Sequence, residues 1–448
     1  MASNIEEFGP YEEYKSPPEG WMEKAPSDWE IKRARYCFEE VNERSETGEE
    51  VLFSLSKYQG LVPRKNLTGE DHRADSLEGY KICREGDIVM NKMQAWNGMF
   101  GLADQKGIVS PDYTVFRPQA NILPEYYLYL LKTPMYVGQF RCRSRGIGTA
   151  YLRLHTQYFY DIPLYHPPLE IQQKIVSFLD HHTSQIDSLI ERKENLLDLL
   201  EERRQGLITR AVTTGLNSGS EMEDSGIEPF SKIPETWSTT KLKFVTTAII
   251  DSEHNTAPEE PDGDYHIIRT SDVRDGELKL QQTQRTNREV YEEWTKRGTP
   301  SHGDLIFTRE APAGEVGLIP NDAEVLLGQR TVLISPDESE ITARFLCYYL
   351  QSDVVSWYIN LTSQGSTVDH LNLSDLRDLP LFLPPKQTQD EIVEQLSSKI
   401  TRIDSLEDYV TDAISYFKEK RESIINSAVT GQIDVSGWEL PREEVVTA

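Results

Sequence analysis

A long internal repeat is the feature that most constrains how this chain can fold. The segment DIPLYHPPLEIQQKIVSFLD begins at Asp161, and the similar segment DLPLFLPPKQTQDEIVEQLS begins at Asp378, 217 positions later. The same offset places the tetrapeptide IDSL at Ile186 over a second IDSL at Ile403. Two copies of such a long unit predict two similar folded halves in one chain, unlike a solenoid built from many short units.

The repeat extends beyond these segments. GDIVMNK, from Gly86, lies over GDLIFTR, from Gly303, at the offset of 217. Nearer the start of each half the offset is 208, where APSDWEIKRARY from Ala25 lies over IPETWSTTKLKF from Ile233. We interpret the difference between the offsets as a difference in loop length inside the repeated unit.

Length and composition agree with a protein of several domains. A chain of 448 residues is too long for one hydrophobic core. No apolar run approaches the roughly 20 residues needed to cross a membrane, and MASNIEEFGPYEE does not resemble a signal peptide. We therefore expect a soluble cytoplasmic protein. The four cysteines are widely separated, so a disulfide framework and a structural zinc site are both disfavoured.

The spacing of apolar residues and of Gly and Pro predicts an α+β architecture with two globular units and two long helices. Short β-branched runs interrupted by Gly, Pro and Asp are typical of strands, and PEYYLYLLKTPMYVGQF forms one helical patch between them. The segments we expect are an N-terminal arm at residues 1–24, a globular unit at 25–168, a long helix at 169–214, a linker at 215–232, a second globular unit at 233–385, a second long helix at 386–431 and a tail at 432–448.

Both long segments carry apolar residues at spacings of three and four, which is typical of an amphipathic helix. At 1.5 Å per residue each helix would be about 65 to 70 Å long. We expect the two to pack antiparallel as a coiled coil; the alternative is that each packs only on its own globular unit. The expected seam consists of Ile175, Leu179, Ile186, Leu189, Leu196, Leu200, Leu207, Ile392, Leu396, Ile400, Ile403, Val410, Ile414, Phe417 and Ile424.

A basic stretch stands out in this acidic chain. Residues 132–160 contain five basic residues and no acidic one, although the whole chain has a net charge of -27. Arginines between small residues suit contacts with phosphates and guanine. The alternative is that they pair with acidic residues elsewhere. The candidate DNA contacts are Lys132, Arg141, Arg143, Arg145, Thr149, Tyr151 and Arg153 in the first unit, and Arg309, Arg330, Gln364, Ser366, Thr367 and His370 in the second. We expect the two units to read different sequences.

Sequence motifs for catalysis are missing. A DNA methyltransferase needs an Asn/Asp-Pro-Pro-Tyr/Phe site for the flipped base, and HPPL and LPPK lack both the amide or acid and the aromatic residue. A Walker loop is also absent. Asp262 and Asp264 could suggest a nuclease metal site, but a solvated loop is the simpler interpretation. We expect no catalytic residue, bound metal or cofactor in this chain.

The motifs together resemble the specificity subunit of a type I restriction-modification enzyme. The resemblance is carried by RQGLITRAVTTGLN at the end of the first long helix, by MEDSGIEPFSKIPETWSTTKLKF entering the second globular unit, and by the two proline-led helix starts with their IDSL segments. It implies two target recognition domains, each reading one half of a bipartite DNA sequence, with the helices as spacer and docking site.

The resemblance also implies partners. They would be two modification subunits that bind S-adenosylmethionine, and restriction subunits that hydrolyse ATP with Mg²⁺ and cut DNA. Two other functions stay open at this stage. A structural scaffold would join partner proteins without sequence preference, and an independent enzyme would show turnover as the isolated chain.

The charge composition predicts adaptation to concentrated salt. The chain has 74 acidic and 47 basic residues, of which 20 are lysine. Raising the ionic strength from 0.1 to 1 M shortens the Debye length from about 10 to about 3 Å and so weakens repulsion between carboxylates. We therefore expect the protein to come from a halophilic prokaryote. A protein that is folded and monodisperse in dilute buffer but salts out early would contradict this expectation.

Overall fold

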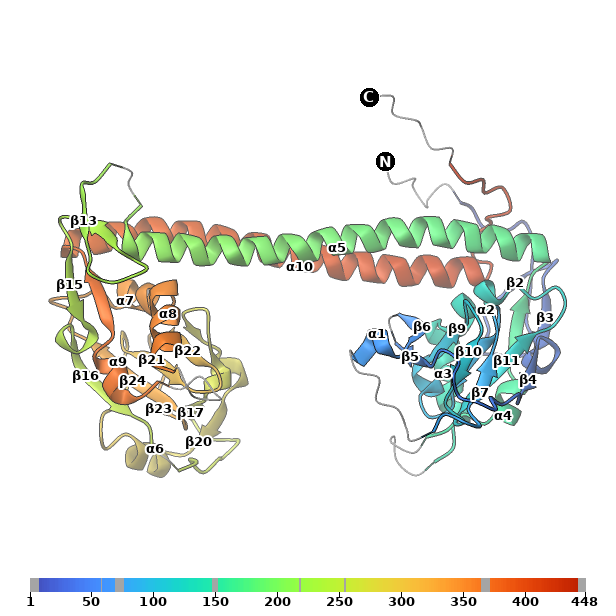
Figure 1. Ribbon diagram of the computed structural model, residues 1–448, viewed down its shortest axis with the longest axis horizontal. Helices are drawn as coiled ribbons and strands as arrows, with labels where there is room; N and C mark the ends of the chain where they lie inside the picture. The colour runs from blue at the N-terminus through green and yellow to red at the C-terminus, as the bar shows by residue number, and fades with distance from the viewer. Residues whose placement is uncertain are drawn as a thin grey trace. The chain divides into compact units, whose positions relative to one another are not determined.

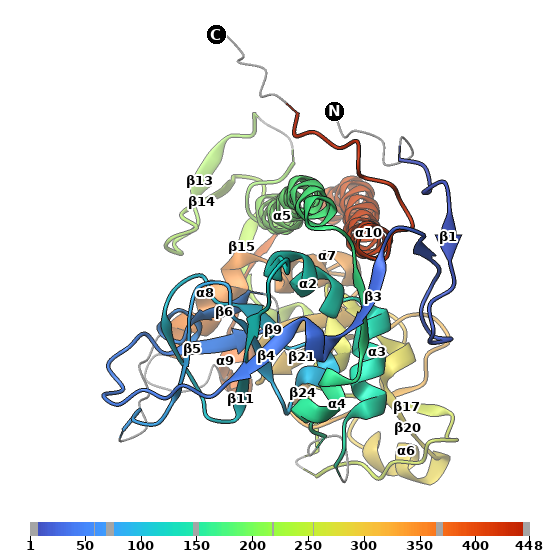
Figure 2. The ribbon, with the colours of Figure 1, turned by 90° about the vertical axis from the view of Figure 1, so that its right-hand side faces the viewer.

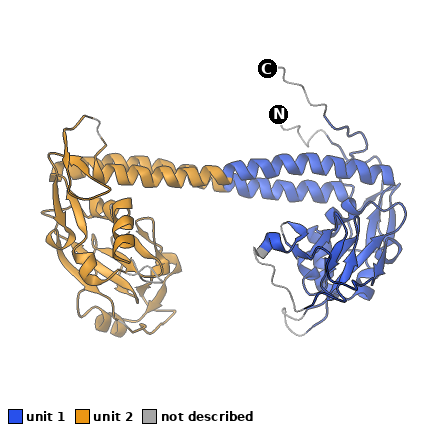
Figure 3. Cartoon of the chain, viewed as in Figure 1, with its two compact units in different colours: residues 1–193, 412–448 blue, residues 194–411 orange. Residues whose placement is uncertain are grey.

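The computed structural model describes residues 8–57, 59–68, 76–146, 152–216, 219–253, 255–363 and 371–441. The chain divides into two compact units, one formed by residues 1–193 and 412–448 and the other by residues 194–411 (Figure 3). Both long helices, α5 (Leu169–Thr213) and α10 (Lys386–Val429) (Figure 1), are divided between the two units (Figure 3). Each unit therefore consists of a globular part and one segment of each helix.

The first unit is built around a four-stranded antiparallel sheet with helices packed against it (Figure 2). In spatial order its strands are β4 (Phe38–Val41), β11 (Tyr113–Pro118), β8 (Ile88–Asn91) and β9 (Phe100–Leu102). Two-stranded sheets are formed by β1 (Tyr14–Lys15) with β2 (Ala25–Pro26), β3 (Glu30–Arg33) with β12 (Pro163–His166), β5 (Phe53–Ser56) with β6 (Gly60–Pro63), and β7 (Lys81–Cys83) with β10 (Gly107–Val109). The helices of the globular part are α1 (Lys65–Thr68), α2 (Pro124–Leu131), α3 (Pro134–Arg143) and α4 (Thr156–Tyr160).

The helical patch expected as one element is two helices. Helix α2 ends at Leu131 and α3 begins at Pro134. Proline cannot donate a backbone hydrogen bond inside a helix but fits its first turn, so Pro134 ends one helix and starts the next.

The second unit repeats this architecture. Its four-stranded sheet has the order β16 (Thr246–Asp251), β24 (Thr331–Pro336), β21 (Leu305–Arg309) and β22 (Ala313–Leu318). The strands β15 (Ser238–Lys241) and β25 (Pro380–Leu383) pair as β3 and β12 do, and β13 (Met222–Asp224) and β14 (Lys232–Pro234) pair as β1 and β2 do. The equivalents of α2, α3 and α4 are α7 (Ala343–Leu350), α8 (Asp353–Thr362) and α9 (Leu373–Arg377). The α+β class and the internal duplication are thus confirmed.

The second unit also contains a second, smaller sheet. Its three-stranded sheet has the order β20 (Gln284–Thr286), β17 (Tyr265–Ile268) and β23 (Val325–Leu327), with β17 and β23 parallel. Helix α6 (Arg288–Trp294) and the short pair β18 (Val273–Arg274) and β19 (Glu277–Leu278) belong to the same stretch of the chain. Asp262 and Asp264, which could have suggested a metal site, lie in the turn before β17.

A buried glutamine fixes each long helix to its globular part. The side-chain oxygen of Gln172 accepts the backbone N–H of Leu123 at 2.9 Å, and its amide donates to the carbonyl oxygens of Asn121 at 3.2 Å and Pro167 at 2.9 Å. Gln389 makes three equivalent bonds of 2.7 to 3.0 Å in the second unit. Because both side chains are fully buried, these bonds set how the helix leaves the globular part.

Ion pairs join the two long helices within each unit. Arg421 of α10 pairs with Asp187 of α5 at 2.8 Å in the first unit. Arg204 of α5 pairs with Asp404 of α10 in the second. The aspartates belong to the two IDSL segments, and both the aspartates and the arginines are related by the 217-residue offset. The helices therefore run antiparallel in each unit, with the partners exchanged between the copies.

The helix seam follows the expected pattern except in the middle of α5. Leu196 is 36% exposed, whereas Ile190 and Ile208 are buried. The expected seam places Leu189 three residues after Ile186. Because an α-helix has 3.6 residues per turn, Ile190 faces the seam instead, and Leu196 faces away from it. Of the other expected residues, Leu189, Leu207 and Phe417 are half-buried, and those buried are Ile175, Leu179, Ile186, Leu200, Ile392, Leu396, Ile400, Ile403, Val410, Ile414 and Ile424.

Described residues near both ends of the chain pack on the first unit. The rings of Phe8 and Trp438 each lie against Phe178 of α5, at centroid distances of 5.1 and 5.3 Å. The N–H of Asp434 donates to the carbonyl of Gly9 at 2.8 Å. Part of the segment expected to be a loosely held arm is therefore held by aromatic contacts and backbone bonds, because it covers apolar helix surface.

The glutamine anchor generates a stability prediction. Replacing Gln172 by Leu leaves one N–H and two carbonyl groups of the backbone without this partner, so we expect the free energy of unfolding to fall by about 2 to 4 kcal/mol. The neighbouring Gln173→Leu, on an exposed helix position, is the matched control and should change it little. Urea unfolding measures both. Equal stabilities for the two variants would show that the anchor does not matter.

Candidate nucleic-acid interface

The basic stretch of the first unit is held beside the end of strand β8. Arg145 and Arg153 exchange two backbone hydrogen bonds of 3.0 and 2.9 Å, which close the base of the loop between α3 and α4. The next residue, Leu154, donates its N–H to the carbonyl of Lys92 at 2.9 Å. Lys92 directly follows β8, so the sheet positions both the lysine and the loop.

A polar cavity opens at this place. It has a volume of about 420 Å³. The lining residues are Lys92, Arg145, His155, Thr156, Gln157 and Tyr158. The guanidinium carbon of Arg145 lies 5.5 Å from the centre of the Tyr158 ring, which orients it. None of the described residues that line it is acidic, so the cavity can bind a phosphate or a base edge through cations and neutral donors.

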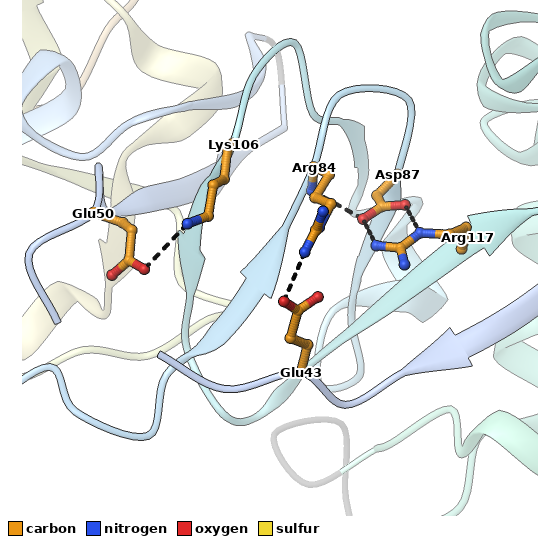
Figure 4. A network of polar contacts seen from close by, with 6 residues as sticks. All are labelled: Glu43, Glu50, Arg84, Asp87, Lys106 and Arg117. Atoms are coloured by element: carbon orange, nitrogen blue, oxygen red, sulfur yellow. Dashed lines mark hydrogen bonds and ion pairs between the residues drawn. The ribbon is translucent and has the colours of Figure 1, made fainter. Parts of the chain in front are cut away.

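The opposite end of β8 is held by a network of charges (Figure 4). The buried Asp87 accepts two hydrogen bonds from the guanidinium of Arg117, at 3.1 and 3.0 Å, and one from the backbone N–H of Arg84 at 2.9 Å. Arg84 also pairs with Glu43 at 2.7 Å. Carboxylates thus neutralise the basic residues here, and Asp87 raises the pKa of Arg117 mainly through these hydrogen bonds.

The arginines of the basic stretch have different surroundings. Arg141 lies over the ring of Trp96 at 5.9 Å, and Arg143 lies over Trp21 at 6.0 Å and bonds to the Gln139 side chain. Among the residues that the structure describes, no carboxylate pairs with Arg141, Arg143, Arg145 or Arg153. The described residues therefore do not support the alternative that acidic residues pair with these four arginines.

Lys132 differs from these arginines in its position. Its side chain is half-buried at the end of α2, and the pKa of its amine is lowered by burial and then by the charge of Arg421 on α10. It therefore lies near the helix pair. Two other candidates of this unit, Thr149 and Tyr151, lie outside the described residues.

In the second unit the candidate arginines are paired with acidic residues. Arg309 occupies the position equivalent to Lys92, and its carbonyl accepts the N–H of Leu371 at 3.1 Å. Its side chain is buried and pairs with Asp251 at 3.3 Å. Arg330 is exposed and pairs with Glu310 at 3.2 Å. Acidic residues therefore neutralise the charges of Arg309 and Arg330. The other candidates of this unit, Gln364, Ser366, Thr367 and His370, lie outside the described residues.

Sequence reasoning missed five residues of the cavity, which are Lys92, His155, Thr156, Gln157 and Tyr158. Lys92 could have been found, because GDIVMNK and GDLIFTR both end on a basic residue. The other four, His155, Thr156, Gln157 and Tyr158, carry no such signal, because their role depends on the short helix α4 facing the end of β8. Among the described residues no cluster of His, Cys, Asp or Glu suits a metal ion, and no helix is long and apolar enough to span a membrane.

Comparison with known protein families gives a clear match. The family described as type I restriction modification DNA specificity domain matches residues 65–198 and 234–414. The EcoBI specificity subunit of Escherichia coli is 26% identical and aligns over 70% of this chain and 67% of its own length. The EcoKI specificity subunit of the same species is 24% identical over 74% of this chain and 70% of its own length.

Solved structures share the fold. One chain, from a study of the assembly and conformational transition of the type I R-M system, superposes with a TM-score of 0.70 at 17% identity and covers 92% of this chain and 100% of its own length. The HsdS subunit of Thermoanaerobacter tengcongensis gives a TM-score of 0.50 at 16% identity, covering 92% and 98%.

Cysteine chemistry offers a probe of this surface. Cys142 lies between Arg141 and Arg143 and is exposed, whereas Cys37, Cys83 and Cys347 are buried. Burial raises the pKa of Cys37 and of Cys347 to about 11 and that of Cys83 to about 12, so their reactive thiolates are scarce at neutral pH. We expect a maleimide to modify one thiol per native chain, and Cys142→Ser to abolish the reaction. Several thiols reacting at similar rates would contradict the burial.

Proposed function

Because this chain belongs to the type I restriction modification DNA specificity family, we propose that each of its two units reads one part of a bipartite DNA target. The chain is a DNA sequence-recognition subunit and is not itself an enzyme, since catalysis in these systems lies in partner subunits. A scaffold without DNA readout is not favoured.

The observation that carries the proposal is the cavity beside β8. Lys92, which lies 4.0 Å from Glu40, and Arg145 line it in a chain whose net charge is -27, and none of its described lining residues is acidic. Long-range repulsion between this chain and DNA must therefore be overcome by local cations. His155 and Gln157 add donors and acceptors that can distinguish base edges.

The two units differ at this site, which supports different half-targets. Lys92 is partly exposed and lies 4.0 Å from Glu40, whereas Arg309 in its place is buried and lies 3.3 Å from Asp251. At the offset of 217, Asp375 takes the place of Tyr158 and Thr362 that of Arg145. Among its described residues the second unit thus has no arginine in the place of Arg145, and its readout depends more on neutral polar side chains.

The proposed partners follow from the family. We expect two modification subunits that bind S-adenosylmethionine, restriction subunits that use ATP and Mg²⁺, and double-stranded DNA, all in the cytoplasm. The paired helices α5 and α10 would be docking sites and would set the gap between the two half-targets. The excess of acidic residues supports a salt-adapted host, as the composition suggests.

DNA affinity tests the cavity. Arg145→Ala in the assembled complex should weaken DNA binding about tenfold and reduce the slope of log affinity against log salt by about one, as for one lost phosphate contact. Arg143→Ala should do less, because its guanidinium is held over Trp21. The control is Arg84→Gln, since Arg84 pairs with Glu43. Unchanged affinity for Arg145→Ala would remove the cavity from the DNA interface.

The helices can be tested as a ruler. We expect a four-residue insertion in α5 near Leu196, matched by one in α10 near Asp412, to lengthen the spacer by about 6 Å. This corresponds to about two base pairs of B-DNA, at about 34 Å per ten base pairs. Methylation of target libraries with varied gaps measures the preferred spacing. A preference that stays at the original gap would show that the helices do not set it.

A further inference from the structure

Each unit carries an exposed aromatic ring at the same place. Tyr36 and Phe244 are both 67% exposed and are related by the 208-residue offset. Each ends a short 3-10 turn, Ala34–Tyr36 after β3 or Leu242–Phe244 after β15. A single exposed aromatic residue needs no explanation. Two at equivalent positions of the repeat indicate a role outside the fold.

The ring is accompanied by the same charges in both units. Asp161 pairs with Arg33, at 3.6 Å, and with Arg35. Together with Tyr36 these residues form what we call the first knob. The second knob consists of Phe244 with Lys241, Lys243 and Asp378, in which Asp378 lies 3.3 Å from Lys241 and 2.7 Å from Lys243.

The chemistry is retained although the residues are not. Lysines replace arginines, and Phe244 lacks the hydroxyl of Tyr36, so the common elements are an apolar ring, two cations and one carboxylate. Each knob thus carries one net positive charge. Its complement is an apolar pocket that receives the ring and has a carboxylate at its rim.

We propose that the two knobs are docking points for two copies of one protein partner, one copy on each unit. The equivalence of the knobs requires the same partner surface twice. This inference rests on the proposed function, under which the modification subunit binds in two copies.

DNA suits the knobs less well than a protein. A stacked duplex offers no apolar pocket for a protruding ring, and the central carboxylate of each knob repels phosphate. The knobs are also alike, whereas the surfaces proposed to read the two half-targets differ.

The test is a titration of the full chain with its modification subunit, followed by native mass spectrometry and sedimentation. We expect the wild-type chain to bind two copies. In Tyr36→Ser or Phe244→Ser one copy should keep its affinity while the other is weakened about tenfold to a hundredfold, the effect of no longer burying one aromatic ring. The double variant should weaken both copies.

Control variants separate docking from loss of structure. Tyr36→Phe reproduces the ring of the second knob and should bind like the wild type. Val51→Ser and Met222→Ser change residues that are 41% and 36% exposed and are not part of either knob, and they should also bind normally. Thermal melting of each isolated variant should match the wild type, because the rings are exposed.

Three results would overturn the proposal: knob variants that keep both copies at wild-type affinity, controls that weaken binding equally, or knob variants that lose DNA affinity but not partner affinity. In each of these cases the wild-type chain still binds two copies, so the proposed function stands. A wild-type chain that binds no modification subunit would instead contradict both the partners in the proposed function and the knobs.

Discussion

The antiparallel pairing of α5 with α10 is the interaction on which the rest of the structure depends, because each unit is completed by a helix segment from the other half of the sequence. Residues 412–429 close the first unit, where the buried hydroxyl of Tyr126 donates to the carbonyl of Val429 at 2.9 Å. Residues 194–213 close the second in the same way, with Ile208 and Val212 in its core. Neither half of the sequence could bury its apolar surface alone.

Comparison of the two units distinguishes the contacts that the fold requires from the residues that can vary with the DNA sequence recognised. Gln172 and Gln389 keep all their bonds, as do the interhelical ion pairs. At the start of β8 and β21, Asp87 and Asp304 each accept a backbone N–H from three residues earlier, at 2.9 Å. The frame is thus conserved within the chain while the residues around the loop between α3 and α4, or between α8 and α9, diverge. Such a division allows new target sequences without rebuilding the fold.

The repeat alone predicted the architecture, since two copies at a constant offset specify two similar units and matching long helices. The repeat could not show which residue lies in the seam in the middle of α5. Leu189 and Ile190 are both apolar, and which of them faces α10 depends on the rotation that accumulates along the helix. The basic stretch located a candidate surface, but the sequence could not show that Arg309 and Arg330 meet Asp251 and Glu310, because those contacts are made by folding. The cavity residues on α4 escaped prediction for the same reason.

The central claim is that this chain directs modification to a two-part DNA sequence. Single-molecule methylation sequencing of host DNA, with and without the gene for this chain, tests it most directly. The account predicts a split, asymmetric motif with a fixed gap that is methylated in the parent and unmethylated after deletion. Identical methylation in both strains, in a host whose modification subunit is expressed, would contradict it.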